Sequence, residues 1–309
     1  IESKKMTSKL GYIASYPKSG NTWLRLILSN YFFGSSEPIL PNTLKEYIGA
    51  DTTENFYNQY AKKTNIKFNA VINDYRLRNA ALRDYLSKNP NTFLKTHAAF
   101  HYRDNIPYFD PGITGIFIYL IRDPRDILIS SAHHNLGSPI FEKNKIGANG
   151  LVGAQELEII FNSMSNMKQA LTMPSGIQTH LGAWDDHVNS FKQVSNRLHI
   201  IKYEELANQT YSTASEIIQF INKITLSPNK IIKDKLKNAV QSTSFDKLKK
   251  KEDKEGFSEA VPSRKQNNKK ITFFNLGPKN RWNELLSNDF KNKLSNTFKK
   301  NLKELSYEK

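Results

Sequence analysis

The sequence of 309 residues contains no cysteine. This absence excludes disulfide bonds, thiolate nucleophiles and cysteine-bound metals as sources of stability or chemistry. The chain also lacks an apolar run long enough to span a bilayer and a signal-peptide pattern at its start. No cluster of carboxylates and histidines has the spacing of Mg²⁺ or Zn²⁺ ligands. We therefore expect a cytoplasmic protein without a metal site.

Acidic residues are scarce beside basic ones: there are 29 Asp and Glu against 45 Lys and Arg, and the formal net charge is +16. Such an excess attracts an anionic partner, which can be nucleic acid, a membrane surface, or an acidic cofactor or substrate. Much of it lies in runs such as residues 247–251 and 269–270, which are typical of solvated faces or mobile loops. Charge alone leaves these classes of partner open.

Short apolar runs alternate with longer stretches of helical periodicity. Strands are predicted over residues 11–15, 92–95, 115–121 and 198–202. Helices are predicted over residues 22–33, 124–136, 154–171, 176–194, 213–222, 231–242 and 289–305. This alternation indicates an α/β fold with a parallel sheet and helices on both faces, in which ligands bind at the carboxyl ends of the strands.

The length suits one domain over residues 1–309. Residues 1–9 are expected to form a flexible N-terminus, with Met6 as a candidate natural start. Residues 249–271 are polar and weakly periodic, which predicts a long, mobile loop. Residues 31–91 contain no clear strand and are expected to cover one face of the ligand site.

The most informative motif is the turn between the first predicted strand and the first predicted helix. Residues 16–23 read Tyr-Pro-Lys-Ser-Gly-Asn-Thr-Trp. Backbone N–H groups at a helix N-terminus, with Gly20 allowing close approach and Lys18 adding charge, form a site for a phosphate or sulfate group. The motif differs from the common nucleotide loop G-x-x-x-x-G-K-[ST], because its lysine precedes its only glycine. An ordinary strand-to-helix turn with a surface lysine is the alternative.

Two further motifs follow predicted strands. Lys95-Thr96-His97 places a histidine, suited to general-base chemistry near neutral pH, on the same face of an extended segment as a lysine. Arg122 ends a continuously apolar strand, and Ser130 lies in the helix that follows Pro124. Arginine and serine there can converge on a phosphate. The alternatives are a structural histidine and local ion pairs at a helix start.

Together the three ordered motifs resemble those of sulfotransferases that use 3′-phosphoadenosine-5′-phosphosulfate (PAPS). The family loop is close to Y-P-K-S-G-T-T-W, its catalytic segment is K-T-H, and its arginine and serine are eight residues apart, as Arg122 and Ser130 are here. The resemblance implies a P-loop NTPase-like three-layer sandwich with a central parallel sheet. It also implies transfer of a sulfuryl group from PAPS to a hydroxyl or amine of an acceptor, leaving PAP and requiring no metal.

The resemblance also implies roles for individual residues. His97 would be the general base, and Lys18 and Lys95 would stabilise the leaving phosphate. Tyr203 and the segment Thr243-Ser244-Phe245 match positions near the purine, and Trp23 is the expected stacking partner. The full set of implied cofactor-binding residues is Lys18, Ser19, Gly20, Asn21, Thr22, Trp23, Arg122, Ser130, Tyr203, Thr243, Phe245, Asn275 and Gly277.

The last family motif, F-R-K-G-x-x-G-x-W, is the one that this sequence matches least well. This chain has Asn275-Leu276 in place of the basic pair, while Gly277 and Trp282 align. We predict a weaker or differently built site for the 3′-phosphate, with Lys279 or Arg281 as candidate replacements.

Two other functions remain as alternatives. A P-loop-type kinase would need a Gly-Lys-Ser/Thr loop and a metal-binding aspartate, and a basic nucleic-acid-binding protein would bind in a salt-dependent manner. Under the favoured interpretation the partner is a small-molecule, glycan or lipid acceptor, with no specific nucleic acid. Residues 31–91, 139–153 and 249–270 match the family loosely and leave the acceptor open. The sequence does not determine the oligomeric state, and a homodimer is one state that it allows.

Overall fold

The computed structural model describes residues 9–35, 37–137, 152–166, 170–172, 176–194, 196–225, 230–261 and 270–308. The predictions for residues 1–8, and most of the loosely matching segment 139–153, lie outside these ranges. A central sheet of four parallel strands has the order β2-β1-β5-β8. Its strands are β1 (Leu10–Ser15), β2 (Phe93–Thr96), β5 (Thr114–Ile121) and β8 (Leu198–Lys202). All four predicted strands are confirmed, with ends that move by at most one residue.

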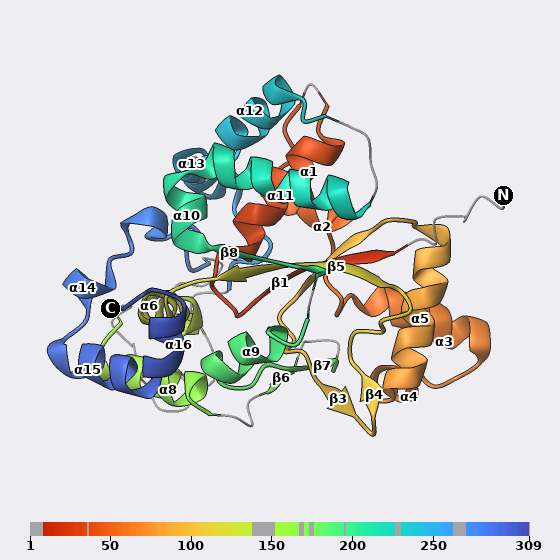
Figure 1. Ribbon diagram of the computed structural model, residues 1–309, viewed down its shortest axis with the longest axis horizontal. Coiled ribbons are helices and arrows are strands. Elements are labelled where there is room, and N and C mark those ends of the chain that lie inside the picture. Colours follow the sequence, from red (N-terminus) through yellow and green to blue (C-terminus); the bar gives the residue numbers. More distant parts are fainter. Residues whose placement is uncertain are drawn as a thin grey trace.

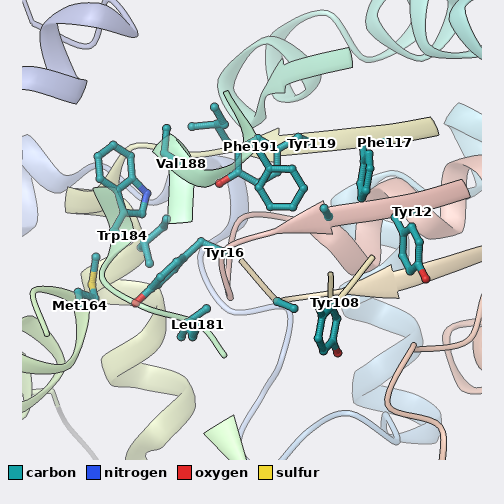
Figure 2. Packing of buried hydrophobic residues seen from close by; sticks show 14 of the residues in the cluster. Tyr12, Tyr16, Tyr108, Phe117, Tyr119, Met164, Leu181, Trp184, Val188 and Phe191 are labelled. Atoms are coloured by element: carbon teal, nitrogen blue, oxygen red, sulfur yellow. The ribbon is translucent and has the colours of Figure 1, made fainter. Parts of the chain in front are cut away.

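Alternating side chains of the strands supply two cores on opposite faces of the sheet. In β5, Phe117 and Tyr119 belong to one cluster, whereas Ile118 and Leu120 belong to the other. A strand buried on both faces has to be apolar throughout, which explains the continuous run in the sequence. Figure 2 shows the first cluster, in which the Tyr119 and Phe191 rings stack with centroids 4.3 Å apart.

The sheet lies between two layers of helices (Figure 1). The layer against Ile118 and Leu120 contains α1 (Asn21–Phe33), α2 (Leu44–Tyr47), α10 (Tyr203–Asn208), α11 (Thr210–Ile224), α12 (Lys233–Ser242) and α13 (Phe245–Glu255). The opposite layer contains α3 (Glu54–Thr64), α4 (Phe68–Asn73), α5 (Tyr75–Lys88), α6 (Pro124–His134), α8 (Ala154–Met164), α9 (Trp184–Phe191), α14 (Trp282–Leu285), α15 (Asn288–Thr297) and α16 (Lys299–Glu304). The predicted three-layer α/β sandwich is confirmed.

Smaller elements complete the described chain. They are the 3₁₀ turns η1 (Pro41–Thr43), η2 (Asn135–Gly137) and η3 (Gly277–Lys279), and the hairpin strands β3 (Tyr102–Arg103), β4 (Ile106–Pro107), β6 (Ala170–Thr172) and β7 (Gln178–His180). As expected, residues 31–91 contribute no strand to the central sheet: where described, they form helices and connections.

Two predicted helices are partly wrong. Residues 170–172 and 178–180 form the antiparallel pair β6–β7 instead of continuing helices 154–171 and 176–194. Gly176 has a φ of 81°, which a helix does not tolerate, and so a hairpin is favoured over helix here. The predicted helix 289–305 is divided into α15 and α16 at Phe298.

The predicted loop over residues 249–271 is also wrong in its first part, because α13 runs to Glu255. Apolar spacing is sparse in this charged helix, but Leu248 is buried and anchors it. The helix ends at Gly256, which has a φ of 71°. Residues 262–269 lie outside the described chain, and the mobility of the segment stays a prediction.

Candidate active site

All four strands of the sheet end at one edge, and each is followed within three residues by a predicted site residue. Strand register sets these ends side by side, since Ala14 pairs with Thr96, Ser15 with Leu120, and Ile121 with Lys202. The loop after β1, His97 after β2, Arg122 after β5 and Tyr203 after β8 therefore meet at the carboxyl edge, where parallel sheets bind ligands.

The loop after β1 has the backbone form of an anion site. Lys18 and Gly20 have φ values of 66° and 96°, and α1 begins immediately afterwards at Asn21. No side chain caps this N-terminus, so the first N–H groups of the helix keep their capacity to bind an anion. Gly20 is required for a second reason, because a Cβ there would lie 2.6 Å from the Tyr203 ring.

Polar atoms in and beside this loop lack partners within the described chain. The Ser19 hydroxyl, the Asn21 carbonyl oxygen and the Arg122 Nε are buried and make no hydrogen bond there. The Asn21 amide group, by contrast, donates to the Ile13 carbonyl at 2.9 Å and to the Ser15 hydroxyl at 3.2 Å. Buried donors without partners are unfavourable unless a ligand satisfies them, so the loop fits a phosphate-bearing cofactor.

Cationic side chains gather at the same edge. The Lys18 ammonium lies 4.2 Å from the centre of the Phe273 ring. Burial, with the charges of Arg122 and Lys95, lowers the pKa of Lys18 to about 7. Burial also lowers the pKa of Lys95. Because these cations lie close together and repel one another, the binding of an anion among them is favourable.

One carboxylate, Glu259, lies among these cations and was not predicted. It accepts hydrogen bonds from the Thr22 hydroxyl at 2.9 Å and from the Arg25 guanidinium at 3.1 Å. Burial alone would raise the pKa of Glu259, but the charges of Lys95 and Arg25 lower it to about 2. Glu259 is therefore an internal anion bonded to the loop that the sequence assigns to phosphosulfate.

His97 is held as a neutral imidazole, and its Nε2 has no hydrogen-bond partner within the described ranges. Its Nδ1 lies 2.7 Å from the Ser15 carbonyl oxygen, which can only accept, so Nδ1 carries the proton and Nε2 the lone pair. The His97 carbonyl accepts from Nε2 of His187 at 3.1 Å, and the Tyr119 hydroxyl bonds to Nδ1 of His187 at 2.7 Å. Burial and the charge of Lys95 lower the pKa of His97 well below its usual value.

Aromatic rings and a guanidinium form the side of the site next to β8. Arg122 donates to the Lys18 carbonyl at 2.9 Å and lies 4.1 Å from the centre of the Tyr203 ring. The Trp23 and Tyr203 rings are 6.1 Å apart, edge to face. The Trp23 indole donates to the Thr243 carbonyl at 2.8 Å, while the Thr243 hydroxyl donates to Ala239. Thr243 thus positions Trp23 through its backbone.

The remaining predicted residues lie around α6, α13 and the segment after residue 270. Ser130 is three and four residues before His133 and His134 on α6, so the three share a face. That face is turned toward the cations, because Lys18 helps to lower the pKa of His134. Phe245 packs so closely on Gly277 that a Cβ there would lie 2.2 Å from its ring.

Lys279 and Arg281 were the candidates to replace the basic pair that is missing at residues 275 and 276. Arg281 is exposed and pairs with Glu284 at 3.2 Å. The side chain of Lys279 lies outside the described part of the chain. Instead, Lys249, which lies in the segment predicted to be a loop, donates to the Asn275 carbonyl at 3.2 Å.

A metal centre and a membrane-spanning helix are both absent from the described residues. No group of three or more His, Asp or Glu side chains there could hold a metal ion. None of the helices there is long and apolar enough to cross a membrane.

Comparison with known proteins identifies the class. The family model for the sulfotransferase domain matches residues 12–306, and the chain therefore belongs to the sulfotransferase family. The resemblance inferred from the motifs is confirmed. A search of the curated proteins gives no match.

Two solved structures illustrate the likeness in fold. A mouse sulfotransferase complexed with PAP has a TM-score of 0.55 and 16% identity, covering 95% of this chain and 84% of that one. Retinol dehydratase complexed with retinol and PAP has a TM-score of 0.55 and 17% identity, covering 95% and 81%. These likenesses confirm the P-loop NTPase-like fold.

Sequence patterns missed Arg25, His187 in its tethering role, Lys249 and Glu259. One signal was present: Arg25 interrupts the apolar run Leu24 to Leu28, and a buried arginine in a core helix needs a carboxylate partner. The partner itself lies 234 residues away in the sequence, and no local pattern indicates it.

Proposed function

We propose that this sulfotransferase transfers the sulfuryl group of PAPS to a hydroxyl or amine of an acceptor, with His97 as base and Lys18 and Lys95 as charge-stabilising groups. One observation carries the proposal: an uncapped helix N-terminus, beside Lys18, lies at the same sheet edge as a histidine whose Nε2 lone pair has no partner among the residues that the structure describes. The geometry combines an anion site with a base and matches the chemistry of the family.

The residues present fit PAPS. The loop from Lys18 to Trp23 would hold the 5′-phosphosulfate through backbone N–H groups, the ammonium and the Ser19 hydroxyl. The Thr22 hydroxyl would join them by leaving Glu259, to which it donates in the free protein. The flat rings of Trp23, Tyr203 and Phe245 suit the purine, beside Thr243. Arg122, Ser130, Asn275 and Gly277 would take the 3′-phosphate, and the unpaired Nε of Arg122 supports this assignment. The PAP in the two solved structures described above is consistent with it.

When bound, PAPS supplies the sulfuryl group and a phosphate leaving group. His97 would accept the acceptor proton at Nε2 while the Ser15 carbonyl keeps the Nδ1 proton in place. Lys18 and Lys95 would neutralise the negative charge that grows on the leaving phosphate. Positioned donors of this kind, and a positioned base, each contribute about 10²–10⁴-fold to the rate.

The test is His97→Ala assayed for both turnover and PAP binding. We expect turnover to fall by about 10²–10⁴-fold while the Kd for PAP changes little, because the histidine acts on the acceptor. His199→Ala is a matched control, since His199 stacks on Phe220 away from the site. Near-normal turnover of His97→Ala with labelled PAPS would refute the base assignment.

The acceptor, a small molecule, glycan or lipid, is best found by screening acceptor classes with labelled PAPS. Mg²⁺-dependent turnover of ATP without sulfuryl transfer would favour the kinase alternative instead. Tight, salt-dependent binding of DNA or RNA would favour the nucleic-acid alternative. The cytoplasmic location, the single domain and a homodimer stay predictions.

A further inference from the structure

The 3′-phosphate end of the cofactor site lacks the charge that its family motif would supply. Asn275 and Leu276 carry no cation, and Arg281 is exposed and engaged with Glu284. Arg122 is committed in part, because one Nη donates to the Lys18 carbonyl. A phosphate dianion bound here would therefore need a further cationic donor from elsewhere in the fold.

Lys249 is positioned to be that donor. It lies one helical turn after Phe245 on α13, and residues four apart share a helix face. Phe245 packs on Gly277, and the Lys249 ammonium reaches the Asn275 carbonyl at 3.2 Å. This face of α13 thus packs against residues 275–277, where the sequence differs from the family motif.

Lys249 also reaches toward α6. Its charge is among those that lower the pKa of His133, three residues after Ser130 on the same helix face. It is half-buried, whereas its neighbours Lys247 and Lys250 are exposed. The ammonium therefore lies between the Asn275 segment and the face of α6 that carries Ser130. In the family motif, a basic residue at position 275 or 276 would supply the positive charge in this place.

We propose that Lys249 provides the cationic contact to the 3′-phosphate of PAPS and PAP, in place of the basic pair absent at Asn275-Leu276. The inference rests on the proposed function. An ammonium has three donors, so the bond to Asn275 leaves two for phosphate oxygens. The 3′-phosphate is held from helix α13 in this enzyme, and the contact discriminates ligands that carry this phosphate from those that lack it.

The experiment compares two ligands that differ in that phosphate alone: PAP and adenosine 5′-monophosphate (AMP). Kd values are measured calorimetrically for the wild type, Lys249→Ala and Lys250→Ala. We expect Lys249→Ala to weaken PAP binding by about 10- to 100-fold and AMP binding by less than about twofold. Unchanged AMP binding also shows that the variant is folded. Lys250→Ala, an exposed neighbour of equal charge, should change neither Kd.

Three results would overturn the inference. Lys249→Ala could leave PAP binding unchanged, or it could weaken PAP and AMP equally, which would make Lys249 a packing residue. Alternatively, Lys279→Ala combined with Arg281→Ala could remove the preference for PAP over AMP while Lys249→Ala keeps it. A wild-type protein that binds neither PAP nor PAPS would refute the proposed function itself and, with it, this inference.

Discussion

Two carboxylate–arginine pairs, both near the carboxyl end of β2, behave in contrasting ways. Asp51 and Arg78 are both almost fully buried, and the Asp51 carboxylate also accepts from the Thr96 hydroxyl at 2.9 Å and the Tyr108 hydroxyl at 3.0 Å. Glu259 pairs with a buried Arg25 but keeps 31% of its own side chain exposed. Burial raises the pKa of Asp51, whereas surrounding cations lower that of Glu259 to about 2.

The difference lies in the balance of charge around each pair. Around Asp51 one arginine, stacked 3.7 Å from the centre of the Tyr108 ring, balances one carboxylate, and tyrosines fill the rest. Around Glu259 the cations Lys18, Lys95 and Arg25 outnumber the carboxylate. The surplus of positive charge distinguishes this region, because a buried donor without a partner among the described residues, the Arg78 Nε, also occurs in the balanced pair.

The largest effect on stability is expected from breaking the buried pair of Asp51 and Arg78. Arg78→Leu leaves the buried Asp51 carboxylate without its counter-charge, so we expect the free energy of unfolding to fall by about 3–5 kcal/mol. Urea denaturation followed by fluorescence measures this. Arg281→Leu, which breaks an exposed pair, should change it by less than about 1 kcal/mol. Equal losses in the two variants would mean that the buried Asp51–Arg78 pair contributes no more to stability than an exposed pair.

Removing a cation from the region around Glu259 should instead lower the rate of catalysis. Lys18→Met is expected to lower turnover by about 10²–10³-fold, because the leaving phosphate loses a stabilising charge. The free energy of unfolding should stay level or rise, since the variant no longer buries a charge beside Arg122 and Lys95. Lys9→Met, remote from the site and bonded to the Gly112 carbonyl, is the control. A Lys18→Met protein that is unstable but fully active would reverse the assignment.

The pH dependence of PAP binding follows from the lowered pKa of Lys18. Above about pH 7 the free protein holds Lys18 increasingly neutral, and a bound anion restores the proton. Affinity should therefore fall by up to about tenfold per pH unit above 7, with proton uptake on binding. Calorimetry at pH 8 in HEPES and in Tris detects that uptake, which Lys18→Met should lack.

The stability of the free protein should change with pH in the opposite sense. Between about pH 7 and the ordinary lysine pKa, the unfolded chain keeps a proton that the folded protein has lost. The free energy of unfolding contributed by Lys18 therefore rises with pH over this window. A loss of stability over the same range in the wild type, absent from Lys18→Met, would contradict the lowered pKa.

The smallest expected effect concerns the internal anion. Glu259→Gln keeps the shape of the side chain but removes the charge next to the Thr22 hydroxyl. We expect PAP to bind more tightly, by about three- to tenfold, because a like charge no longer faces the incoming phosphate. Glu255→Gln, an exposed substitution at the end of α13, should have no effect on the Kd. Weaker binding of Glu259→Gln would mean that the carboxylate positions Thr22 and Arg25 for the ligand.

The strands and the site edge were predictable from the sequence because their signals are local. A continuous apolar run predicts β5, and parallel pairing then places Lys18, His97 and Arg122 at one edge without any contact having to be known. The β6–β7 hairpin was missed because three-residue strands carry too little periodicity. The Glu259 contact with Thr22 joins residues 237 positions apart, and only the packed fold brings them together.

The close packing of Gly20 on the Tyr203 ring couples the binding of the two ends of the cofactor, the phosphosulfate and the base. Gly20 belongs to the turn that would receive the sulfuryl-bearing end of the cofactor, and Tyr203 to the wall that would receive its base. Any side chain at position 20 must displace that ring, so the two subsites cannot diverge independently. An engineer who wished to change the nucleobase accepted here would have to redesign the transfer loop in the same step.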